Sequence, residues 1–340
     1  MNNIQAETFI LLIFSFLTIF TINKFRDKIS KRTKLIDHPD SMRKFHTRSV
    51  PLLGGIMIFS SYLLIHLYLV FFHDLNKISL IIFFSCLSCF LLGLMDDAKG
   101  ISYKYKFLIL IIIFCLSISL EVNLQINKIY ISTLNKELYL NYLSFPFTIF
   151  CLLLLINAIN LIDGINGLCI SVSIIFISWI MLTFQNTQLF NIVLILSLFY
   201  ILLLNLKNYI FLGDTGSLFL GSLIGLNLIS NYNLQISKVH FPVEDIFIAL
   251  MLPGLDMLRV FASRIFNKKN PFSADRSHLH HLLLACKVSQ LKALLLFLIL
   301  IIAPILINQY TEIPQITIIA VSAFLYFGLI ISLKKITSSN

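Results

Sequence analysis

The chain has 340 residues, of which 58% are hydrophobic and 12% are charged, and its formal net charge is +10. A soluble domain carries roughly a quarter charged residues, so the composition excludes a soluble protein and indicates an integral membrane protein. Apolar runs of about 17 to 22 residues suit helices that cross a hydrocarbon core, and they are too long and continuous for barrel strands. No stretch indicates a nucleic-acid partner.

We predict an all-α, polytopic membrane fold that forms one domain over residues 1–340, with about eleven transmembrane helices. The fourth and eighth runs are short, so ten is the alternative count. The first run lacks the basic residues and cleavage site of a signal peptide, which predicts an anchor with its N-terminus outside. The predicted spans are Phe9–Ile22, Gly54–Phe72, Ile78–Met95, Phe107–Leu120, Phe145–Leu161, Leu168–Thr183, Leu189–Leu206, Leu218–Ile229, Val243–Ala262, Leu291–Ile307 and Ile316–Leu333.

The connection between the fourth and fifth spans differs from the rest of the chain. Hydrophobic residues alternate with polar ones over Val122–Leu143, around a break at Ser132–Lys136. This period of two predicts two short strands. We therefore expect a small β-hairpin on the outer, periplasmic face.

Basic residues are distributed unequally between the two predicted sides. Connections on one side contain nine in Lys24–Arg48, three in Lys99–Lys106 and five in Arg264–Lys287. The opposite side contains four, which are Lys77, Lys128, Lys136 and Lys238. The positive-inside rule places the first set in the cytoplasm.

A polar segment, NAINLIDGINGL, follows the fifth apolar run. Asn157 and Asn160 are three residues apart, so they share one face if the helix continues. Asp163 follows, with glycines at 164 and 167 that allow a sharp turn. A capped helix end explains one asparagine and one glycine, but the whole cluster indicates oxygen ligands for a hard cation or a sugar hydroxyl.

Two further motifs place carboxylates on the same predicted side. Asp96 and Asp97 end the third span, where paired carboxylates repel each other unless a cation offsets the repulsion. The segment LGDTGS places Asp214 between two glycines before a helix, which suits a phosphate-bound Mg²⁺. The simpler alternatives are a solvated helix cap for the pair and an N-cap for Asp214.

The last cytoplasmic loop, PFSADRSHLHHLL, contains His278, His280 and His281. These histidines suit zinc, but the oxygen donors elsewhere favour Mg²⁺. We therefore interpret the histidines and Arg276 as donors to phosphate oxygens. All of these motifs lie on the predicted cytoplasmic side, which indicates one composite site at the inner interface.

In order and spacing, these motifs resemble the polyprenyl-phosphate N-acetylhexosamine-1-phosphate transferases of glycosyltransferase family 4. The first cytoplasmic loop, DHPDSMRKFHTRSVPLLGG, adds to the resemblance, and the histidine loop is similar to the N-acetylglucosamine branch. The resemblance implies transfer of N-acetylhexosamine 1-phosphate from a UDP-sugar to undecaprenyl phosphate, with release of UMP. It also implies a Mg²⁺ requirement, with Mn²⁺ as a substitute, a homodimer, and a place in the bacterial inner membrane at the start of cell-envelope glycan synthesis.

The resemblance also implies roles for individual residues. Asn160 and Asp214 are the expected metal ligands. Many bacterial members have aspartate at the position of Asn166, so the resemblance does not extend to a charge-dependent role there. The expected catalytic residues are Asp96, Asp97, Asp163, Lys106, His278, His280 and His281, and the expected substrate-binding residues are Arg43, His46, Asn157, Asn166 and Arg276.

Two alternatives remain at this point. One is the same chemistry with another UDP-N-acetylhexosamine, such as a 6-deoxy sugar. The other is a secondary transporter, which predicts charges in the middle of helices and inverted repeats. The centres of the predicted spans are nearly free of charge and we find no repeat, so the sequence favours the transferase.

Overall fold

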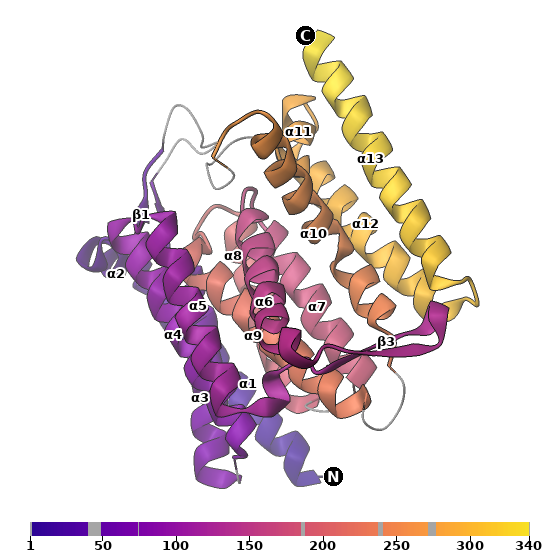
Figure 1. Ribbon diagram of the computed structural model, residues 1–340. Coiled ribbons are helices and arrows are strands. Elements are labelled where there is room, and N and C mark those ends of the chain that lie inside the picture. The colour runs from indigo at the N-terminus through magenta and orange to yellow at the C-terminus, as the bar shows by residue number, and fades with distance from the viewer. Residues whose placement is uncertain are drawn as a thin grey trace.

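The computed structural model describes residues 2–39, 49–73, 75–184, 188–236, 241–270 and 277–339. Long helices form a bundle, with two small two-stranded sheets (Figure 1). A helix covers each of the eleven predicted apolar runs. These helices are α1 (Asn2–Lys24), α3 (Gly54–Phe72), α4 (Lys77–Lys99), α5 (Tyr103–Leu120), α6 (Ser144–Leu161), α7 (Leu168–Phe184), α8 (Gln188–Leu206), α9 (Gly213–Ile236), α10 (Val243–Phe266), α12 (Gln290–Tyr310) and α13 (Gln315–Ser339).

Eight of these helices are long and apolar enough to cross a membrane, namely α1, α3, α4, α5, α6, α10, α12 and α13. α7 and α8 are apolar but shorter over the described residues, and α9 carries more polar residues. Large apolar side chains such as Phe71 and Phe324 point outward, which suits contact with lipid. The chain is therefore a multi-pass, mainly helical membrane protein, and the count of eleven spans stays a prediction.

The structure contains the predicted strand pair, which is shorter than expected, and its place on the periplasmic face stays a prediction. β3 (Lys128–Ile131) pairs antiparallel with β4 (Lys136–Tyr139). The flanking predicted residues form the short 3₁₀ turns η1 (Val122–Leu124) and η3 (Asn141–Leu143) instead of strand. The turn η2 (Ser132–Leu134) joins the two strands.

Several short elements that were not predicted lie at the opposite end of the bundle from the hairpin (Figure 1). They are α2 (Arg26–Thr33), α11 (Leu279–Ala285) and the paired strands β1 (Ile36–Asp37) and β2 (Val50–Pro51). Each is only two to eight residues long, which is too short for an apolar period to mark it in the sequence.

Helix α9 is the centre of the bundle. It packs against α3, α4, α6 and α7, and nearly every residue from Thr215 to Ile229 is buried. The contact with α4 is close because Gly93 has no side chain, since a Cβ there would overlap the backbone of Asp214. Small residues allow helices to approach closely inside a membrane. This packing brings the end of α4 against the start of α9.

Candidate active site

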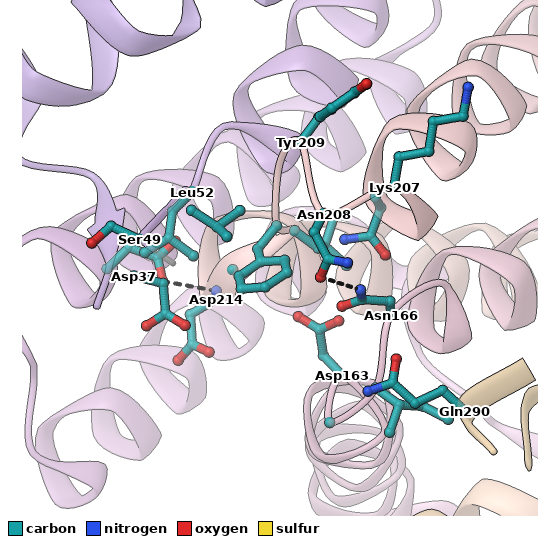
Figure 2. Close-up of a pocket in the computed structure, with 18 of the residues that line it drawn as sticks. Asp37, Ser49, Leu52, Asp163, Asn166, Lys207, Asn208, Tyr209, Asp214 and Gln290 are labelled. Carbon is teal, nitrogen blue, oxygen red and sulfur yellow. Dashed lines mark hydrogen bonds between the residues drawn. The ribbon is translucent and has the colours of Figure 1, made fainter. Parts of the chain in front are cut away.

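A cavity of about 800 Å³ opens at the end of the bundle that carries β1 and α11 (Figures 1 and 2). Its walls come from segments that are far apart in the sequence. The polar and charged residues that line it are Asp37, Ser49, Asp97, Asp163, Asn166, Asn205, Lys207, Asn208, Tyr209, Asp214, His281 and Gln290. A cavity of this volume accommodates a ligand of small-molecule size.

Asp97 caps the first turn of α9, although it belongs to α4. Its Oδ1 accepts a hydrogen bond from the backbone N–H of Asp214 at 2.9 Å. Its Oδ2 accepts from the backbone N–H and the hydroxyl of Thr215, at 2.9 and 2.5 Å. A carboxylate at a helix N-terminus satisfies N–H groups that have no partner within the helix and interacts favourably with the helix dipole.

This cap corrects the expected start of the eighth apolar helix, which was Leu218. α9 begins at Gly213 because an acceptor from another helix completes its first turn. Gly213 has a φ of +72°, and a Cβ there would collide with the Asp97 carboxylate. LGDTGS is therefore the beginning of the helix, and Asp214 lies in its first turn.

Lys106 joins the carboxylates of Asp96 and Asp214. Its Nζ lies 2.5 Å from Asp96 Oδ2 and 2.5 Å from Asp214 Oδ2. Asp96 Oδ1 also accepts the backbone N–H of Ile101 at 2.5 Å. Three helices, α4, α5 and α9, are thus connected by one half-buried group of charges, in which the lysine offsets the repulsion between two carboxylates.

Asn160 connects α6 to the same group. Its Nδ2 donates to Asp214 Oδ1 at 2.9 Å and to Ser217 Oγ at 2.8 Å. Asn157, one turn earlier, donates instead to the carbonyl oxygen of Leu153 in its own helix at 2.7 Å, and it does not line the cavity. We expected both asparagines to lie at one site. Asn160 contacts the charged group, whereas the side chain of Asn157 is bonded within its own helix.

Hydrogen bonds in the cavity wall connect the loop after α6 to the end of α8 and the loop that follows it. Asn166 donates to Asn208 Oδ1 at 2.7 Å (Figure 2). Asn205 Oδ1 accepts the backbone N–H of Gly167 at 2.5 Å, and Asn205 Nδ2 donates to the carbonyl oxygen of Ile210 at 3.0 Å. These bonds fix the loop that contains Asp163.

Asp163 faces the cavity from that loop, and Figure 2 shows its carboxylate in the same space as those of Asp37 and Asp214. Burial, followed by the negative charges of three neighbouring aspartates, raises the pKa of Asp163 to about 8. The described lining residues include four aspartates and one lysine, Lys207, so the negative charges outnumber the positive ones even with Asp163 protonated. The cavity therefore has an excess of negative charge that a bound cation would offset.

The histidines occupy three different environments. His278 is buried and its Nδ1 lies 2.9 Å from Asp256 Oδ2. His280 is fully buried, and its ring is so close to Gly164 that a Cβ at Gly164 would overlap Nε2. Burial lowers the pKa of His280, which favours the neutral ring. Only His281 lines the cavity.

The structure thus brings together Asp96, Asp97, Lys106, Asn160, Asp163, Asn166, Asp214 and His281 of the predicted site residues. His278 and His280 lie behind the cavity wall, and Arg43, His46 and Arg276 lie outside the described residues. The sequence reasoning missed the cavity-lining residues Lys207, Asn208, Tyr209 and Gln290. The polar residues in 205–209, two residues before LGDTGS, were a usable signal.

The donor set around Asp214 suits a hard cation. Mg²⁺ is commonly held by one or two carboxylates together with substrate phosphates and water, and it prefers oxygen ligands. Asp214 supplies carboxylate oxygens at the cavity wall, the side-chain amide of Asn160 lies beside it with its nitrogen bonded to Asp214 Oδ1, and Asp163 lines the same cavity. The described residues contain no group of three histidine, cysteine or acidic side chains placed to hold a metal ion.

The chain is similar in sequence to proteins of known families. The model of glycosyl transferase family 4 matches residues 79–231, from α4 to α9. The chain is 29% identical over 297 residues to the probable undecaprenyl-phosphate N-acetylglucosaminyl 1-phosphate transferase of Bacillus subtilis, covering 84% of this chain and 80% of that protein.

Two further relatives are undecaprenyl-phosphate alpha-N-acetylglucosaminyl 1-phosphate transferases. The Escherichia coli K12 protein is 27% identical over 317 residues, covering 87% of this chain and 81% of the relative. The Thermotoga maritima protein is 29% identical over 273 residues, covering 78% of each chain. The similarity therefore extends well beyond the segment that the family model matches.

Proposed function

We propose that the chain is a member of glycosyl transferase family 4, whose model matches residues 79–231, and that it transfers N-acetylglucosamine 1-phosphate from the UDP-sugar to undecaprenyl phosphate. The observation that carries the proposal is the joining of Asp96, Lys106, Asn160 and Asp214 into one charged group beside a cavity of nucleotide-sugar size.

In this reaction a phosphate oxygen of the lipid attacks the sugar-linked phosphorus of the donor. A new phosphorus–oxygen bond forms, the bond to the bridging oxygen of the diphosphate breaks, and UMP leaves with that oxygen. Phosphoryl transfer depends chiefly on positioning and charge neutralisation, so the protein needs no covalent nucleophile. Lys106 and the cavity residues hold the donor diphosphate, and the acceptor phosphate is already ionised at neutral pH.

Mg²⁺ is the proposed cofactor, and Asp214 and Asn160 are the proposed ligands, with Mn²⁺ as a substitute. When bound, the ion neutralises the charge that develops on the transferred phosphate. The excess of carboxylates on the cavity wall supports this proposal, because a diphosphate has two or more negative charges and is repelled by that wall without a cation.

An apolar groove supports a lipid acceptor. It has a volume of about 340 Å³, lies between α6, α9 and α10, and is lined almost entirely by apolar side chains. One end reaches Ile129 of the hairpin. The other reaches Ala158, two residues before Asn160 on α6, so a prenyl chain in the groove places its phosphate near the charged group.

Substitution of Gly254 by leucine is expected to raise the KM for undecaprenyl phosphate about tenfold. Gly254 lines the groove, and a Cβ there meets nothing within 4 Å, so the larger side chain fills space without a clash. Loss of contact with about two methylene groups corresponds to about tenfold in affinity. Steady-state kinetics with varied lipid checks this, and the KM for the UDP-sugar should not change.

Gly328→Leu is the matched control. Gly328 lies in α13, also has nothing within 4 Å of an added Cβ, and does not line the groove. Equal effects of the two substitutions on the lipid KM would argue against the groove as the acceptor site.

We further propose that the cavity faces the cytoplasm and the hairpin faces the periplasm of a bacterial inner membrane. The unequal distribution of basic residues supports this orientation. A cysteine introduced at Gly100, at the end of α4, should react with an impermeant maleimide only in inside-out vesicles. A cysteine at Lys136 in the hairpin should react only from the other side, and the reverse pattern would overturn the orientation.

The function is tested by release of UMP from purified protein supplied with UDP-N-acetylglucosamine, undecaprenyl phosphate and Mg²⁺. Omission of the lipid or chelation of the metal should each stop release, and Mn²⁺ should restore it after chelation. Turnover only with another UDP-hexosamine would keep the chemistry and change the donor. Absence of turnover with every donor, in folded protein, would refute the transferase.

A further inference from the structure

Asp256 in α10 is almost completely buried, and its carboxylate has hydrogen-bond partners on four different residues. Its carboxylate accepts the hydroxyl of Tyr326 at 2.8 Å and the Arg259 guanidinium at 2.8 Å. It also accepts the backbone N–H of Leu279 at 3.1 Å, and His278 Nδ1 lies 2.9 Å away. A buried carboxylate is stable only when it is paired and hydrogen-bonded in this way.

Arg259 and Tyr326 connect this carboxylate to two other parts of the chain. Arg259 Nε donates to the Tyr326 hydroxyl at 2.7 Å, so that hydroxyl accepts from the arginine and donates to Asp256. Arg259 Nη2 also donates to the carbonyl oxygen of Ser277 at 2.6 Å. Asp256 and Arg259 of α10 therefore bond the segment that leads into α11, and Tyr326 of α13 bonds both of them.

The position of α11 decides which histidine reaches the cavity. Leu279 is the first residue of α11, and its N–H is bonded to Asp256. His280 then packs against Gly164, the residue after Asp163, and His281 lines the cavity. Adjacent residues of a helix point about 100° apart, so a small rotation of α11 moves both rings.

We propose that Asp256, Arg259 and Tyr326 form a positioning unit for the binding of the nucleotide-sugar donor. The unit sets the rotation of α11, and thereby the place of His281 and of the Asp163 loop. None of its three residues lines the donor cavity, so they act through the histidine segment. The inference rests on the proposed function, because it identifies the donor as the ligand whose binding depends on the unit.

Substitution of Tyr326 by phenylalanine tests the proposal. The ring stays in place, but the Arg259 Nε–H loses its acceptor and Asp256 loses a donor. A hydrogen bond to a charged group corresponds to about tenfold or more in an equilibrium constant. We expect the KM for UDP-N-acetylglucosamine to rise about tenfold, with kcat and the KM for the lipid each changing less than twofold.

Hydrogen–deuterium exchange gives a readout that needs no substrate. In the purified protein, Tyr326→Phe should increase exchange in peptides that cover 277–286 and leave those covering α6 unchanged. Tyr310→Phe is the matched control, because the Tyr310 side chain at the end of α12 is 76% exposed. It should alter neither the kinetics nor the exchange.

The possible outcomes separate the two proposals. Wild-type protein that turns over no UDP-hexosamine would contradict the transferase, while the exchange comparison would still decide whether Tyr326 holds α11. Unchanged exchange at 277–286, or a fall in kcat without a change in the donor KM, would overturn the positioning unit.

Discussion

Replacement of Asp214 by asparagine is expected to reduce turnover about a thousandfold without unfolding the protein. Asp214 Oδ1 and Oδ2 contact Asn160 and Lys106, so the carboxylate is the common partner of α6 and α5 in the charged group. An amide has the same shape but no negative charge to hold a cation. Loss of one electrostatic contact to the transition state typically costs 10²- to 10³-fold.

The fold should survive this change for a structural reason. The bond between Asp214 and the Asp97 cap uses the backbone N–H of residue 214, which asparagine retains. Lys106 also keeps Asp96 as a partner. UMP release and the melting temperature in detergent should be measured together. Asp27→Asn, at a side chain that is 77% exposed, serves as the control, and more than a tenth of wild-type activity in Asp214→Asn would refute the metal-ligand assignment.

Replacement of Asp97 by alanine is expected to reduce both stability and turnover. Two backbone N–H groups and the Thr215 hydroxyl lose their acceptor. Loss of a helix cap lowers the free energy of unfolding by up to about 2 kcal/mol. Because the first turn of α9 carries Asp214, we also expect turnover to fall about a hundredfold, which thermal unfolding and UMP release check directly.

Comparison of Asp97→Asn with Asp97→Ala separates a cap from a catalytic base. Asparagine is a good cap, but its single side-chain oxygen replaces only one of the two Asp97 oxygens that accept these bonds, so a capping role predicts activity and stability between those of wild type and alanine. An amide cannot accept a proton at neutral pH, so a base predicts that the two variants are equally inactive even where asparagine keeps more of the stability than alanine. The second pattern would support the catalytic assignment of Asp97.

The positions of the long helices followed from the sequence because a membrane imposes a simple rule, although several helices, such as α9, extend beyond the predicted apolar runs. A helix must be apolar for about 20 residues to cross it, so Gly54–Phe72 was predicted at both of its ends. The hairpin was also predictable, since alternation at β3 and β4 differs from the surrounding apolar runs. The gathering of the polar motifs at one end of the bundle followed from counting charges in the loops.

The roles within the site were less predictable. The sequence shows that Asp96 and Asp97 are adjacent, but it does not show that one meets Lys106 and the other the start of α9. Adjacent residues of a helix point in different directions, so the side chains of Asp96 and Asp97 reach different partners. For the same reason His280 packs against Gly164 while His281 lines the cavity. The residues at 205–209 could have been predicted as site residues, because they too form a cluster of polar side chains at the end of an apolar run, as Asn157–Leu168 does.

The cap on α9 also has a consequence for the order in which the protein is made. The bonds from Asp214 and Thr215 to Asp97 span 117 and 118 residues, so α4 leaves the ribosome long before its partner exists. Contacts of such sequence separation form late in folding, because a long loop must close first. The charged group therefore assembles only after α9 has been synthesised, and a nascent chain that stops before α9 contains the acidic pair without a site.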